Sequence, residues 1–189
     1  MHCCPLTHPS LPGKTYHALQ RLMAAKTEHG GGLYCGPLRL LALEVYEQLN
    51  KSGIYCNLIT GQEQRRMPFS THVSCTVEVV PVNVPYDVAI IDEIQMINDE
   101  NRGFAWTRAL LGLCAREIHV AGGLEAAPVV RAMAEKTGDS FELRTYERLS
   151  KLVYVHDSFV LVDLILIFGL LVIIKNMALE FDIPYCKIY

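Results

Sequence analysis

The feature that most constrains this chain is a short apolar run that ends abruptly in two carboxylates. Residues 88–91 are Val-Ala-Ile-Ile, which predicts a buried strand of a parallel sheet, and Asp92 and Glu93 follow at once. Open α/β sheets bind their ligands at the carboxyl ends of such strands. An Asp-Glu pair there suits a magnesium nucleotide, because one carboxylate orders the metal's water shell and the other orients an attacking water. The alternative is a solvated acidic turn after a core strand.

A second half of a nucleotide site lies upstream, where Pro-Gly-Lys-Thr precedes an amphipathic pattern. In the phosphate loop G-x-x-x-x-G-K-[ST], backbone N–H groups hold the phosphates, the lysine neutralises the outer ones and the hydroxyl binds the metal. Gly13, Lys14 and Thr15 fit this pattern. His8 takes the position of the first glycine, and Pro12 cannot donate a hydrogen bond to a phosphate. We therefore expect weak nucleotide binding.

Six segments together resemble one known family. In chain order they are GKTYHALQRL, YCGPLRLLALEVYEQLN, LITGQE, HVSCTVE, VAIIDEIQMI and GFAWTRALLGLCAREIHVAG. The set resembles the mitochondrial degradosome RNA helicases, which are ATP-dependent superfamily-two enzymes with a DExH-type box. The resemblance runs from about Gly13 to about Leu149. It covers only the first of that family's two RecA-like motor domains.

The resemblance implies a role for each residue of the nucleotide site. Lys14 would hold the outer phosphates of ATP, and Thr15 and Asp92 would bind Mg²⁺. Glu93 would orient the attacking water, and Gln95 would relay between nucleotide and nucleic acid. The reaction implied is ATP hydrolysis coupled to unwinding of RNA or DNA duplexes.

The resemblance also implies nucleic-acid contacts at Arg39, Thr60, Gly61 and Thr76. Arg39 has an alternative as a solvated basic residue in a first helical turn, and the others fit ordinary strand or turn chemistry. Because the formal net charge is -3, no global basic field indicates nucleic-acid binding, and any RNA contact must come from a local groove. The family's partner is an exoribonuclease, for which no contact residue is identifiable.

Alternating strand and helix patterns predict an α/β fold with a doubly wound parallel sheet. The resemblance implies that this sheet belongs to a RecA-like P-loop NTPase domain. Residues 1–12 carry three prolines and no sustained apolar run, so we expect a poorly formed first strand there. Residues 13–149 would form the helicase domain and 150–189 a divergent tail. The patterns predict helices over 14–28 and 124–136, strands over 54–60, 72–80, 118–121 and 141–146, and a polar loop over 62–71.

The tail contains a 16-residue apolar run at 159–174, interrupted only by Asp163. A membrane span needs about 20 apolar residues, so a buried or aggregation-prone segment is favoured over a membrane tether. The second-lobe motif Q-x-x-G-R-x-x-R does not occur. We therefore expect an ATP-binding lobe that is inactive alone, with a catalytically dead nucleotide- or RNA-binding module and a membrane-tethered adaptor as alternatives. Mitochondrial localisation follows from the resemblance only, since no presequence opens the chain.

Overall fold

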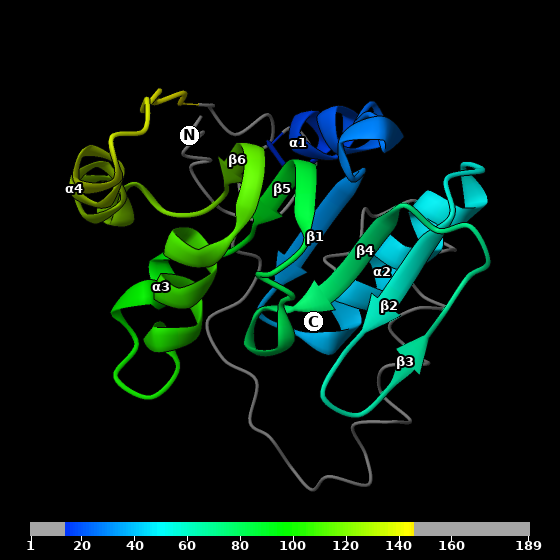
Figure 1. Cartoon of the computed structure of the whole chain (residues 1–189). Coiled ribbons are helices and arrows are strands. Elements are labelled where there is room, and N and C mark those ends of the chain that lie inside the picture. The colour runs from blue at the N-terminus through cyan, green and yellow to red at the C-terminus, as the bar shows by residue number, and fades with distance from the viewer. Residues whose placement is uncertain (1–13, 146–189) are drawn as a thin grey trace, which may run out of the picture. The chain divides into compact units, whose positions relative to one another are not determined.

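Helices and strands alternate over residues 14–59 and 85–137, whereas the strands between residues 56 and 91 follow one another with no α-helix between them. The computed structural model describes residues 14–145, whose strands form one sheet in the order β3-β2-β4-β1-β5-β6. All pairs are parallel except β2 with β3, which lies antiparallel at one edge (Figure 1). The strands are β1 (Gly32–Gly36), β2 (Cys56–Ile59), β3 (Gln64–Arg65), β4 (His72–Thr76), β5 (Pro85–Ile91) and β6 (Cys114–Val120).

Helices cover both faces of this sheet (Figure 1). They are α1 (Lys14–Met23), α2 (Arg39–Lys51), α3 (Gly103–Gly112) and α4 (Ala127–Thr137), with 3-10 turns at Thr27–His29, Val77–Val79, Ile94–Asn98 and Leu124–Ala126. One apolar cluster joins α1 and α2 to Tyr34, Val88 and Ile90. The other joins α3 and α4 to Leu33 and Ala89. Since successive strand residues point to opposite faces, β1 and β5 supply both clusters, and the doubly wound α/β fold is confirmed.

The carboxyl-terminal end of α1 is fixed at the amino ends of two strands. The carbonyl of Leu22 lies 3.0 Å from Nε2 of His72, the first residue of β4. The backbone N–H of Lys26 donates to the Asp87 carboxylate at 2.8 Å, near the start of β5. These contacts hold the helix that the phosphate-loop pattern begins.

Two predicted strands are corrected. Residues 141–145 form no strand, and Tyr146 lies outside the described residues. Phe141 instead packs on the core, with the Arg131 guanidinium of α4 at 5.0 Å from its ring centroid. The strand expected over 72–80 ends at Thr76, because the chain then turns and buries Val77 and Val80.

The loop expected over 62–71 contains the two-residue strand β3. The expected strand at residues 1–12 and the apolar run at 159–174 lie outside the described residues. In the part of the chain that is described, no helix is both long and apolar enough to cross a membrane.

Candidate nucleotide site and nucleic-acid edge

Asp92 and Glu93 lie directly after β5, at the carboxyl edge of the sheet. The backbone N–H of Asp92 donates to the carbonyl of Cys35 in β1 at 2.9 Å. The N–H of Ile94 donates to the carbonyl of Ala121, just beyond β6, also at 2.9 Å. The two carboxylates therefore sit where β1, β5 and β6 end, as predicted for a binding edge.

Three groups orient Asp92. Its Oδ2 accepts a hydrogen bond from the Tyr34 hydroxyl at 2.8 Å, and its Oδ1 accepts from the Glu93 N–H at 3.0 Å. Its carbonyl accepts from the Trp106 indole N–H at 3.0 Å. Tyr34 and Trp106 are buried. Burial first, and then the charge of Asp92, raises the pKa of Tyr34 well above its ordinary value, so the hydroxyl stays protonated as a donor.

Neither Tyr34 nor Trp106 is among the residues that the sequence predicts for this site. Gly36, at the end of β1, makes room for the tyrosine, since a Cβ there would lie 2.8 Å from its hydroxyl oxygen. Tyr34 and Gly36 are two residues apart on one strand and so share a face. That spacing accounts for the room that Gly36 leaves for the ring, but it gives no sequence signal for the contact with Asp92, which depends on the pairing of β1 with β5.

Gln95 ties the acid pair to the chain beyond β6. Its amide nitrogen donates to the Glu93 carboxylate, and its Oε1 accepts the Gly123 N–H at 3.0 Å. A Cβ at Gly122 would clash with Gln95 Oε1, so glycine is required for this approach. Glu93 itself has φ 52° and ψ 49°, a left-handed conformation that is uncommon for a residue with a side chain. Such conformations cluster at functional sites.

Three of the predicted nucleic-acid residues lie together. Arg39 is the first residue of α2, and its guanidinium contacts the Gln62 side-chain carbonyl and, at 3.5 Å, the Glu63 carboxylate. The Thr60 N–H donates to the Glu63 carbonyl at 2.8 Å, and the Thr60 hydroxyl accepts the Glu63 N–H at 3.0 Å. Gly61, in this closed turn, has open space where a side chain would lie. The guanidinium and an accessible backbone turn therefore form one surface.

The fourth predicted residue, Thr76, ends β4 and is 8% exposed. It pairs in register with Gly36, so it lies beside the turn that leads into Arg39. The sheet thus brings Thr76 to the same edge as the other three residues.

Lys14 and Thr15 begin α1, as a phosphate loop requires, and Gly13 lies outside the described residues. No group of three His, Cys, Asp or Glu side chains within residues 14–145 makes a cation site of its own. Nucleotide-bound Mg²⁺ needs fewer protein ligands, because it keeps several waters and phosphate oxygens. Asp92, an oriented oxygen donor beside a second carboxylate, fits that requirement.

Comparison with known proteins identifies the family. The family described as the DEXQ-box helicase domain of Suv3 matches residues 2–146. Asp92, Glu93, Ile94 and Gln95 supply the four letters of that box. The chain belongs to the Suv3 helicase family. The resemblance seen in the sequence is confirmed, with glutamine in the fourth position of the acid box.

Relatives in this family are much longer. The chain is 53% identical over 152 residues to the DExH-box ATP-dependent RNA helicase DExH18, mitochondrial, of Arabidopsis thaliana, covering 80% of the chain and 19% of the relative. It is 51% identical over 146 residues to the ATP-dependent RNA helicase SUPV3L1, mitochondrial, of Homo sapiens, covering 75% and 18%. The chain therefore spans about a fifth of the length of these relatives.

A solved structure agrees with the fold. The helicase domain of Pyrococcus furiosus Hef matches with a TM-score of 0.51 at 16% sequence identity. The match covers 75% of this chain and 34% of that one. At this identity the match shows the shared fold alone, and it confirms the RecA-like architecture expected for the Suv3 domain.

Proposed function

We propose that this chain is the magnesium-ATP-binding motor domain of a mitochondrial RNA helicase. The observation that carries the proposal is the bridge from Glu93 through Gln95 to Gly123. Glu93 is the carboxylate that would orient the attacking water. The bridge connects it to the loop after β6, at the same edge of the sheet. The family membership and the names of the plant and human relatives support the same activity.

In the proposed mechanism, Lys14 would neutralise the outer phosphates of ATP, and Thr15 and Asp92 would hold magnesium. The metal, when bound, offsets the negative charge of the phosphate oxygens. Glu93 orients and accepts a proton from the attacking water. Tyr34 fixes the Asp92 carboxylate, so its oxygens need little rearrangement when the nucleotide arrives.

RNA, or DNA, would lie along the edge formed by Arg39, Thr60, Gly61 and Thr76. Arg39 supplies a positive charge for a phosphate, and the backbone of Gly61 is open to the same ligand. Thr60 contributes by closing the turn that presents Gly61. At the start of α2, Leu38 provides no side-chain cap, so backbone N–H groups of the first turn are available to a phosphate.

We propose that these 189 residues by themselves bind magnesium-ATP and RNA but do not unwind a duplex. In two-lobed helicases the second lobe supplies the arginine that stabilises phosphoryl transfer, worth roughly 10³–10⁵ in rate. An exoribonuclease partner and mitochondrial localisation remain predictions from the family. A catalytically dead binding module is the second candidate, favoured by His8 and Pro12 in the phosphate loop.

Calorimetry with magnesium-ATP tests the nucleotide site. We expect a dissociation constant of about 10⁻⁴ M for the wild type and at least a ~10-fold weaker one for Lys14→Ala. Lys26→Ala is the matched control, because it makes the same change just beyond the other end of α1. Lys26 contacts Asp87 through its backbone N–H, which the substitution keeps. An unchanged isotherm for Lys14→Ala contradicts the proposal.

Strand displacement separates a working motor from a binding domain. With excess chain and saturating magnesium-ATP, we expect no ATP-dependent separation of an RNA duplex. Displacement that is lost in Glu93→Gln would show that the arginine comes from another copy of the chain.

A further inference from the structure

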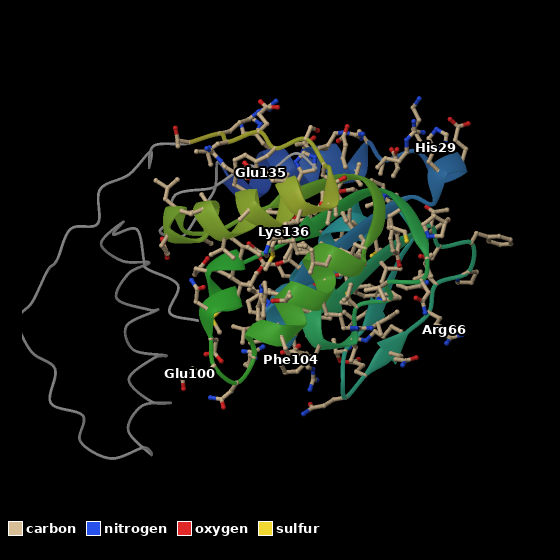
Figure 2. All side chains as sticks on the ribbon, turned by 60° about the vertical axis from the view of Figure 1, so that its left-hand side comes forward. His29, Arg66, Glu100, Phe104, Glu135 and Lys136 are labelled. Carbon is tan, nitrogen blue, oxygen red and sulfur yellow. The ribbon has the colours of Figure 1, made fainter. Side chains whose placement is uncertain are left out.

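Trp106 lies between the acid pair and the proposed RNA edge. It is the only tryptophan of the chain, and its side chain is fully buried. Its indole N–H donates to the carbonyl of Asp92 at 3.0 Å. The guanidinium of Arg102 lies over its ring, with the central carbon 5.3 Å from the ring centroid. Phe104, on the same helix, is instead 68% exposed (Figure 2), so Trp106 is the aromatic side chain that α3 directs inward.

Arg102 also contacts two segments of the RNA edge. Its Nη2 donates to the Pro37 carbonyl at 2.7 Å and to Glu78 Oε1 at 2.6 Å, and its Nε donates to Glu78 Oε1 at 3.1 Å. Pro37 lies in the turn that leads into Arg39, and Glu78 follows Thr76 by two residues. One guanidinium therefore links both segments to the ring of Trp106.

The base of Arg102 is fixed, whereas its guanidinium can be reached from solvent. The Asp99 carboxylate accepts the N–H groups of Asn101 and Arg102 at 2.9 and 2.8 Å. The Gly103 N–H donates to the Asp99 carbonyl at 2.9 Å. The side chains of Arg102 and Glu78 are 38% and 37% exposed. A phosphate at this edge can thus compete with Glu78 for the guanidinium without disturbing the backbone.

We propose that Arg102 is a positioning residue that couples RNA binding at this edge to the magnesium-nucleotide site, through Trp106 and Asp92. When an RNA phosphate replaces Glu78 as the partner of the Arg102 guanidinium, the contact of the guanidinium with the Trp106 ring changes. The indole N–H that donates to the Asp92 carbonyl then shifts as well. By linkage, a bound nucleotide changes RNA affinity by the same factor. The inference rests on the proposed function, because it needs both ligands.

Trp106 reports on this coupling directly, because its fluorescence is the only tryptophan signal of the chain. The test titrates the full chain with single-stranded oligouridylate, then with magnesium-ATP in the absence and presence of saturating RNA. In the wild type we expect RNA to change Trp106 emission and to change nucleotide affinity about fivefold or more. In Arg102→Gln, RNA should leave the emission unchanged, and the coupling factor should fall to about one.

Arg108→Gln is the matched control. Arg108 lies in α3, which Arg102 precedes as the N-cap, and it donates to the Glu78 backbone carbonyl at 3.5 Å. Its replacement by glutamine removes the same charge from the same surface. It should keep the emission change and the coupling. Arg102→Lys should restore part of the coupling, because an ammonium keeps the charge but lacks the planar fork that serves Pro37 and Glu78 together.

The outcomes separate the inference from the proposed function. Wild-type binding of both ligands with no coupling, or full coupling in Arg102→Gln, overturns the role of Arg102 alone. Equal weakening of nucleotide binding with and without RNA in Arg102→Gln shows a merely structural role and also overturns it. Failure of the wild type to bind either ligand removes the proposed function, and the inference with it.

Discussion

An aspartate lies near each end of β5, one within the strand and one directly after it, and the two differ in what surrounds them. Asp87, at the amino end, is 5% exposed and accepts the Lys26 N–H at 2.8 Å. Its carboxylate lies 3.7 Å from the Arg21 guanidinium. Asp92, at the carboxyl end, accepts hydrogen bonds from Tyr34 and from the N–H of Glu93, whose own carboxylate lies next in the chain.

The comparison separates a structural acid from a binding acid. The Lys26 N–H, and then the charge of Arg21, lower the pKa of Asp87, so its charge is favoured by the fold itself. At the other end, two adjacent carboxylates concentrate negative charge, which favours a cationic ligand. We therefore expect changes at Asp87 to affect stability and changes at Asp92 to affect ligand binding.

The largest expected effect is that of Asp92→Asn on magnesium-ATP binding. The amide keeps the shape but loses the charge, so the affinity for magnesium-ATP should fall by about 100-fold or more. Loss of a group that only hydrogen-bonds to a metal ligand already lowers metal affinity by about 10–100-fold. The melting temperature should change little. Calorimetry in magnesium and in EDTA measures the loss; retained magnesium-dependent binding would contradict the assignment.

The matched change at the other end, Asp87→Asn, should destabilise the fold. It removes a charged acceptor from a backbone N–H and an anion from Arg21, which should cost about 2 kcal/mol. Urea denaturation measures this cost, and magnesium-ATP affinity of the folded variant should equal that of the wild type. Loss of nucleotide binding with unchanged stability would reverse the comparison.

Tyr34→Phe should weaken magnesium-ATP binding by about tenfold, because Asp92 loses the hydroxyl that orients it. The effect is measured by titrating nucleotide binding with magnesium. The magnesium concentration that gives half-maximal binding should be higher in the variant than in the wild type. A shift of the urea midpoint with no change in magnesium dependence would assign Tyr34 to the core alone.

The smallest expected effect is a fall in stability at mildly acidic pH. Burial lowers the pKa of His72 below its ordinary value of 6.5, so below that pH the unfolded chain binds more protons than the folded one. The stability that neutral His72 contributes is complete above about pH 6.5 and is lost as pH falls through the folded pKa. The urea midpoint should fall in the wild type and in His29→Gln, and fall less in His72→Gln. An equal fall of the urea midpoint in all three proteins would exclude His72 as the source of the pH dependence.

Local patterns predicted the elements of the site because each has its own signal. The strand before Asp92 is an apolar run that ends in two acids, and Lys14 begins a helix where the phosphate-loop pattern requires one. The support of Asp92 was not predictable in this way. Tyr34 lies 58 residues away in sequence, and only the pairing of β1 with β5 brings it to the acid.

The unpredicted strand β3 and the incorrectly predicted strand at 141–146 have the same physical origin, because a strand depends on a partner strand as well as on its own pattern. Both residues of β3 are exposed, so the strand has no apolar signal and depends only on backbone pairing with β2. The run from Phe141 alternates like a strand, but Phe141 packs beside Arg131 of α4. Alternation predicts a strand only where a partner strand accepts it.

The difference between the two ends of β5 is tested most directly by nuclear magnetic resonance of the ¹⁵N-labelled chain titrated with magnesium-ATP. The account predicts that amide shifts concentrate at Gly36, Asp92, Glu93 and Gly123, which lie at the carboxyl edge. The amides of Lys26 and Asp87, at the amino end, should move least. Shifts centred on Lys26 and Asp87, or none at Asp92 and Glu93 under saturation, would contradict the assignment of the nucleotide site.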